Sequence, residues 1–72
     1  MLIKNKNGVY RITDMDKDGI SFNADTLKGK MYIEVEPDEV SDFLFSADQA
    51  EQFALALLGL VKECREYNEK DE

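Results

Sequence analysis

The strongest pattern along the chain is a set of apolar residues that recur every three or four positions in its last third. The set consists of Ala50, Phe53, Ala54, Leu57, Val61 and Cys64. Residues at this spacing share one face of a helix. Just before them, Ser46 and Gln49 have the S-x-x-Q spacing of a capping box, in which each side chain bonds the other residue's backbone N–H. We therefore predict a helix over about residues 47–67 and a frayed, acidic tail over residues 68–72.

Alternating apolar and polar residues predict β-strands before this helix, within about residues 1–45. The Asn7-Gly8 pair is a hairpin signal, because both residues tolerate a positive φ. The expected strands cover residues 1–5, 9–13, 20–24 and 31–36, and residues 40–45 form either a fifth short strand or an irregular approach to the helix.

The segment 31–36 has the clearest alternation, and it indicates a sheet that is covered on one face. Its odd-numbered residues are apolar, whereas its even-numbered residues are Tyr32, Glu34 and Glu36. Such a strand buries one side and exposes the other to water. The expected fold is therefore α+β: a small antiparallel meander of three to five strands with one C-terminal helix packed on its apolar face, within a single domain of 72 residues.

The formal net charge of −7 is concentrated in the middle of the chain. Residues 31–61 hold seven Asp or Glu and neither Lys nor Arg, which argues against direct binding of nucleic acid. The N-terminal sequence MLIKNKNG lacks the apolar stretch of a signal peptide, and the longest apolar run, residues 53–61, is too short to span a bilayer. We therefore expect a cytoplasmic protein that does not act at a membrane.

The residue types in the chain give little support for a catalytic site. The chain has no histidine, the commonest general base, and its single cysteine, Cys64, lies on the apolar helix face. Neither a Ser/His nor a Cys/His nucleophile pair can be assembled, and no phosphate-binding glycine motif occurs. We expect a protein that is not an enzyme and a thiol that is buried and unreactive.

One loop has a pattern that is used for metal binding, with carboxylates at Asp14, Asp16 and Asp18 followed by Gly19. This spacing resembles the start of an EF-hand-type calcium loop, in which such oxygens converge on one cation. The loop departs from that pattern at its twelfth position, where Asp25 replaces the bidentate Glu. A weak calcium site is one hypothesis and a polar turn is the other, and no further cofactor is expected.

The acidic middle of the chain is the first candidate for binding a partner. The candidate residues are Tyr32, Glu34, Glu36, Asp38, Glu39 and Asp42. Carboxylates along an exposed strand and the loop after it would complement a basic groove on another protein, with the tyrosine as an anchor. The pattern predicts a small acidic interaction module, with an inhibitor or a mimic of nucleic acid as its most specific form. The alternative is a solvated surface that keeps a small protein soluble.

A second candidate surface lies on the helix, outside its main apolar face. Leu58 falls at the edge of that face and Leu55 well beyond it. Gly59 is unusual there, since a glycine inside a helix costs roughly 1 kcal/mol relative to alanine. These three residues predict a homodimer contact, as in a structural or scaffold protein. The alternative is a wide core stripe with a tolerated glycine.

Overall fold

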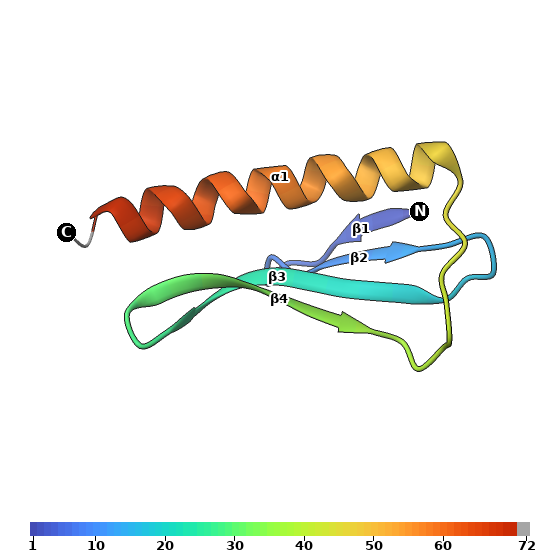
Figure 1. Cartoon of the computed structure of the whole chain (residues 1–72), viewed down its shortest axis with the longest axis horizontal. Coiled ribbons are helices and arrows are strands. Elements are labelled where there is room, and N and C mark those ends of the chain that lie inside the picture. Colours follow the sequence, from blue (N-terminus) through green and yellow to red (C-terminus); the bar gives the residue numbers. More distant parts are fainter. Residues whose placement is uncertain (71–72) are drawn as a thin grey trace.

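Within the part of the chain that the structure describes, one helix lies along one face of a four-stranded antiparallel sheet (Figure 1). The computed structural model describes residues 1–70. Each strand pairs with the next one along the chain, in the order β1-β2-β3-β4. The α+β meander with a C-terminal helix expected from the sequence is therefore confirmed. The elements are β1 (Leu2–Lys4), β2 (Tyr10–Thr13), β3 (Gly19–Leu27), β4 (Lys30–Pro37) and α1 (Ala47–Lys70).

The hairpin between β3 and β4 is longer than the sequence pattern predicts. Its turn consists of two residues, Lys28 and Gly29, with φ angles of 54° and 81°. Two successive positive φ angles are typical of the tight turns that match the twist of a hairpin. As a result Leu27 pairs with Lys30, and β3 continues three residues beyond its expected end at residue 24.

The core lies between α1 and the sheet, and all four strands contribute to it, β1 through Leu2 and β4 through Ile33. Ile12, Ile20, Phe22 and Leu60 form its buried cluster. The ring of Phe22 stacks on Tyr10 with centroids 5.2 Å apart and meets the ring of Phe53 on the helix at 5.0 Å. Aromatic contacts of this kind join sheet and helix through large apolar areas.

The segment 38–46, which joins β4 to α1, is irregular. The second of the two expectations for residues 40–45 is therefore the correct one. Phe43 and Phe45 stack with centroids 5.9 Å apart, and Phe45 lies 5.8 Å from Phe53 of the helix. These contacts attach the connecting segment to the helix that follows it.

The start of α1 agrees with the sequence prediction, but its end does not. The Ser46 N–H donates to Gln49 Oε1 at 2.9 Å, and the Gln49 N–H donates to Ser46 Oγ at 3.1 Å, which confirms the capping box. The helix then continues to Lys70, so the expected end at residue 67 is wrong by three residues. Residues 71–72 of the expected frayed tail lie outside the described residues.

The side of α1 that meets the sheet agrees with the prediction in part, since Phe53 and Leu57 pack against the core and Cys64 is buried, but this side is shifted toward Leu60. Leu60 is 6% exposed and belongs to the core cluster, whereas Ala50 and Ala54, which were expected on this face, are exposed. The small side chains of alanine lose little by facing water, so the bulkier leucine sets the rotation. Cys64 is buried as predicted, and burial raises the pKa of its thiol.

Candidate interaction surfaces

Helix α1 covers one face of the sheet, and none of the elements within residues 1–70 covers the other (Figure 1). Side chains alternate between the two faces along β4. Tyr32, Glu34 and Glu36 therefore share the uncovered face, as the sequence predicts, and all three are exposed. Tyr32 is 56% exposed, which leaves a large aromatic surface in water.

Strand β3 adds residues to this face that sequence reasoning missed. In the register of the hairpin Asp25 pairs with Tyr32, and Asn23 pairs with Glu34. A shallow hollow of about 210 Å³ opens at this end of the hairpin. Its lining consists of Asp25, Thr26, Leu27, Tyr32, Ile33 and Glu34. The signal that could have revealed Asp25 is the Lys28-Gly29 turn, because a two-residue turn fixes which residues face each other.

The hollow combines an aromatic ring with two carboxylates. Asp25 and Glu34 flank Tyr32, one on the neighbouring strand and one two positions along its own. Carboxylates and an exposed ring together suit a guanidinium or ammonium group. Such a cation forms ion pairs with the carboxylates and a cation–π contact with the ring. The arrangement offers acceptors and an apolar surface for a cationic side chain.

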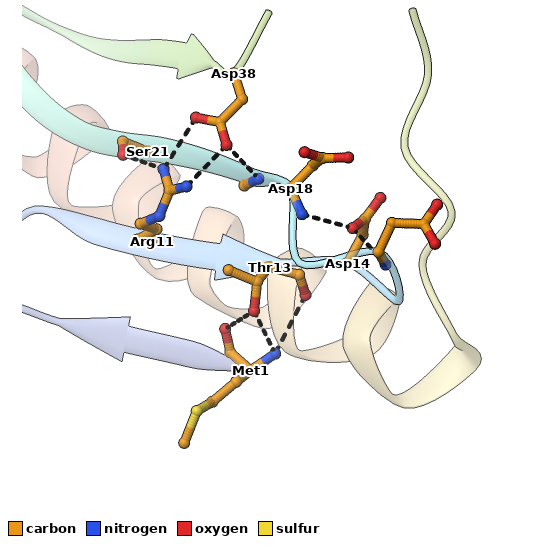
Figure 2. A network of polar contacts seen from close by, with 9 residues as sticks. Met1, Arg11, Thr13, Asp14, Asp18, Ser21 and Asp38 are labelled. Carbon is orange, nitrogen blue, oxygen red and sulfur yellow. Dashed lines mark hydrogen bonds and ion pairs between the residues drawn. The ribbon is translucent and has the colours of Figure 1, made fainter. Parts of the chain in front are cut away.

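Asp38, which was predicted to bind a partner, is instead engaged within the chain (Figure 2). Its Oδ2 lies 2.9 Å from Arg11 Nη2 and its Oδ1 3.3 Å from Arg11 Nη1, a bidentate ion pair. The Gly19 N–H donates a third bond to Asp38 Oδ2, at 2.8 Å. The Arg11 guanidinium, helped by the Gly19 N–H, holds the pKa of the Asp38 carboxyl below its usual value. Asp38 therefore stabilises the open end of the β3–β4 hairpin. Its carboxylate is already paired within the chain.

Gly19 leaves room for the guanidinium of Arg11. A Cβ on residue 19 would lie 2.5 Å from the Cζ and Nη2 atoms of Arg11. The guanidinium thus packs directly over the backbone of Gly19 while it binds Asp38. A larger side chain at position 19 would push Arg11 away from its partner.

Asp14 is the most enclosed of the candidate metal ligands, at 4% exposure. Its Oδ1 accepts the N–H groups of Asp16 and Asp18 at 2.9 and 3.0 Å, as Figure 2 shows in part, and its Oδ2 accepts the Leu44 N–H at 2.9 Å. These backbone donors, Leu44 first, lower the pKa of the Asp14 carboxyl. Both of its oxygens are thus already used by the fold.

The three carboxylates of this loop do not converge on a common point. Within residues 1–70, no group of three or more His, Cys, Asp or Glu side chains is placed to hold a metal ion. Desolvation, together with the charges of Asp14 and other neighbouring carboxylates, raises the pKa of Asp18. The geometry is that of a turn organised around one aspartate, and calcium binding stays an untested prediction.

Glu39 and Asp42 are exposed, but they lie in the connecting segment beyond the end of β4. Tyr32 lies near the other end of that strand, beside the hairpin turn. The acidic run that is continuous in sequence is therefore divided in space. Glu34 lines the hollow, Asp38 is paired with Arg11, and Glu39 and Asp42 lie in the connecting segment.

The helix residues proposed for self-association also face water. Leu55 and Leu58 are each 63% exposed, and Gly59 is exposed beside them. A Cβ added to Gly59 would meet no atom of the described residues within 4 Å. The fold of one chain therefore does not account for two exposed leucines or for the glycine.

Comparison with models of protein families, with curated proteins and with solved structures gave no match. Among residues 1–70, α1 falls short of the length of apolar sequence that crossing a membrane requires.

Proposed function

We propose that the chain is a small non-enzymatic interaction module that binds a basic surface of another protein through the uncovered face of its sheet. The observation that carries this proposal is the hollow beside Tyr32. There Tyr32, which is 56% exposed, has Asp25 opposite it on β3 and Glu34 two positions along β4, and all three residues line the hollow. Large exposed aromatic side chains are enriched where proteins bind one another.

An arginine side chain of the partner fits this chemistry best. Its planar guanidinium can stack on the ring of Tyr32 and donate hydrogen bonds to the flanking carboxylates at the same time. Glu36, further along the same face, extends the negative surface toward the middle of the sheet. This surface would attract a basic groove over a distance and increase the association rate.

A protein that occupies a basic groove on its partner prevents other ligands from binding in that groove. Where the partner's groove binds nucleic acid, the module acts as a mimic of that nucleic acid, and it does not bind nucleic acid itself. The absence of histidine from the sequence supports a role in binding over one in catalysis. We place this activity in the cytoplasm, and it needs no cofactor.

The test is a titration of the ¹⁵N-labelled full chain with a short peptide that contains two arginines among neutral residues. We expect chemical-shift changes centred on Asp25, Tyr32 and Glu34. The double variant Asp25→Lys/Glu34→Lys should weaken binding at least tenfold. The control Glu39→Lys/Asp42→Lys has the same net charge but changes the connecting segment, and it should weaken binding less than twofold.

Circular dichroism of both double variants should match the wild-type spectrum, because all four positions are exposed or partly exposed. Equal loss of binding in the two variants would mean that the peptide responds to net charge alone. Shift changes spread over every carboxylate would lead to the same conclusion. Either result would reject the hollow as a binding site.

A further inference from the structure

The outward side of α1 carries a second regular pattern, distinct from the stripe that packs on the sheet. Six exposed residues recur at alternating spacings of three and four: Asp48, Glu51, Leu55, Leu58, Lys62 and Arg65. This is the spacing of positions a and d in a coiled coil, where two helices meet along a seam. The seam is acidic at its N-terminal end, apolar at its centre and basic at its C-terminal end.

We propose that this seam binds a second copy of the chain, with the two helices antiparallel about a two-fold axis. In an antiparallel pair, residues a of one helix lie level with residues d of the other, so Leu55 packs against the partner's Leu58. The same register sets Glu51 opposite the partner's Lys62. A two-fold axis repeats every contact, so two leucine layers form the centre and an ion pair lies on either side.

The order of the charges selects the antiparallel arrangement. Antiparallel pairing brings Asp48 opposite the partner's Arg65, whereas parallel pairing would set like charges against each other at both ends. Ala54 and Gly59, which flank the leucines, carry no side chain beyond a methyl group. Small flanking residues allow two helix axes to approach closely. A self-complementary surface accounts for the exposed leucines and for a glycine that the monomer does not require.

This interface is independent of the proposed function. The seam residues belong to α1, whereas every residue that lines the hollow beside Tyr32 belongs to β3 or β4, so self-association through the seam leaves the hollow free. The apolar centre consists of two layers, and each chain has a net charge of −7. We therefore expect a weak dimer that forms only at high protein concentration.

The test is sedimentation equilibrium of the full chain over a wide concentration range. It compares the wild type with variants in which the charges of Glu51 and Lys62 are reversed, singly and together. Glu51→Lys and Lys62→Glu should each raise the dimer dissociation constant about tenfold, because each change affects both symmetric ion pairs. The double variant, which restores opposite charges in the antiparallel register, should return to within about threefold of wild type. Glu63→Lys, the same change at an exposed helix position outside the seam, should leave the constant unchanged.

Two further measurements identify the geometry. Leu55→Glu should give a folded monomer at every concentration, with an unchanged circular dichroism spectrum. A zero-length carbodiimide should join Glu51 to Lys62, which lie roughly 16 Å apart along one helix and so can react only between chains. A wild-type chain that stays monomeric at millimolar concentration would overturn the proposal. A double variant as weak as the two single variants would also overturn it.

Discussion

The carboxylate of Asp14 accepts a hydrogen bond at 2.9 Å from the backbone N–H of Leu44, thirty residues further along the chain. The neighbouring Met15 N–H donates in addition to the carbonyl of Leu44, at 3.1 Å. The same Asp14 carboxylate accepts the N–H groups of Asp16 and Asp18 within its own loop. One side chain thus shapes the β2–β3 turn and holds the segment that leads to α1.

Replacing Asp14 should therefore destabilise the whole chain. Asp14→Ala leaves the Leu44, Asp16 and Asp18 N–H groups without their shared acceptor, and we expect the melting temperature to fall by about 5–10 °C. Asp16→Ala is the matched control, because it removes an exposed carboxylate from the same loop. Thermal unfolding followed by circular dichroism compares the two variants. Equal melting temperatures would show that the Asp14 carboxylate does not organise this region.

The ion pair between Arg11 and Asp38 predicts a loss of stability in acid. The pKa values of Asp38 and Asp14 are lowered in the folded chain. Each carboxylate therefore stabilises the fold fully above its unfolded pKa of about 4 and loses that contribution as the pH falls through its lower folded pKa. The pKa of Asp18 is raised, with desolvation as the main cause, so its protonation acts in the opposite direction. Protonation of Asp38 and Asp14 should therefore destabilise the chain in acid, and the raised pKa of Asp18 opposes part of this effect.

Asp38→Asn isolates the part of this effect that comes from the ion pair. The free energy of unfolding, measured with urea, should depend less on pH below about pH 4 in this variant than in the wild type. Asp42→Asn, which changes an exposed carboxylate of the connecting segment, should retain the wild-type slope. An unchanged slope in Asp38→Asn would contradict the assignment.

Local patterns were sufficient to predict the elements of this fold. The capping box of Ser46 and Gln49 involves residues three apart, and the alternation of 31–36 depends on each residue's own position in a strand. Both patterns reflect interactions within a few residues, so the sequence displays them directly. The uncovered position of Tyr32 follows from the same alternation.

The contacts that join distant segments could not be predicted in this way. Asp14 binds Leu44, and Asn68 binds Met31 across 37 residues. Each is a polar side chain bonded to a backbone group, and such a bond leaves no periodic trace in the sequence. The place of Asp25 beside Tyr32 depends on a turn that is two residues long. If the pairing of the two strands shifted by one residue, Asp25 and Tyr32 would point to opposite faces of the sheet.

The rotation of α1 about its axis predicts opposite results for two leucines that are two positions apart. Leu60 is 6% exposed and Leu58 is 63% exposed. Leu60→Ala should lower the free energy of unfolding by about 2–5 kcal/mol, because it leaves a cavity in the core. Leu58→Ala should change it by less than about 0.5 kcal/mol. Urea unfolding at low protein concentration, where the chain is monomeric, measures both, and similar losses would mean that the helix faces the sheet differently.

The last turn of α1 binds the edge of the sheet through Asn68. Its Oδ1 accepts the Met31 N–H at 2.8 Å, and its Nδ2 donates to the Met31 carbonyl at 3.2 Å. The amide thus bonds β4 as a neighbouring strand would, at a strand that forms the edge of the sheet. It also explains why the helix continues beyond the expected end at residue 67, since the contact holds the final turn against the hairpin.

Removing this amide should release both elements together. Asn68→Ala should lower the free energy of unfolding by about 1–2 kcal/mol, because two partly buried hydrogen bonds are lost. Hydrogen exchange of the Met31 amide should become faster, because its acceptor is gone. Asn68→Asp keeps an acceptor for the Met31 N–H but removes the donor to the Met31 carbonyl, so the Met31 amide should stay more protected than in Asn68→Ala. Protection of Met31 that is equal in the wild type and in Asn68→Ala would mean that the helix end does not hold the strand.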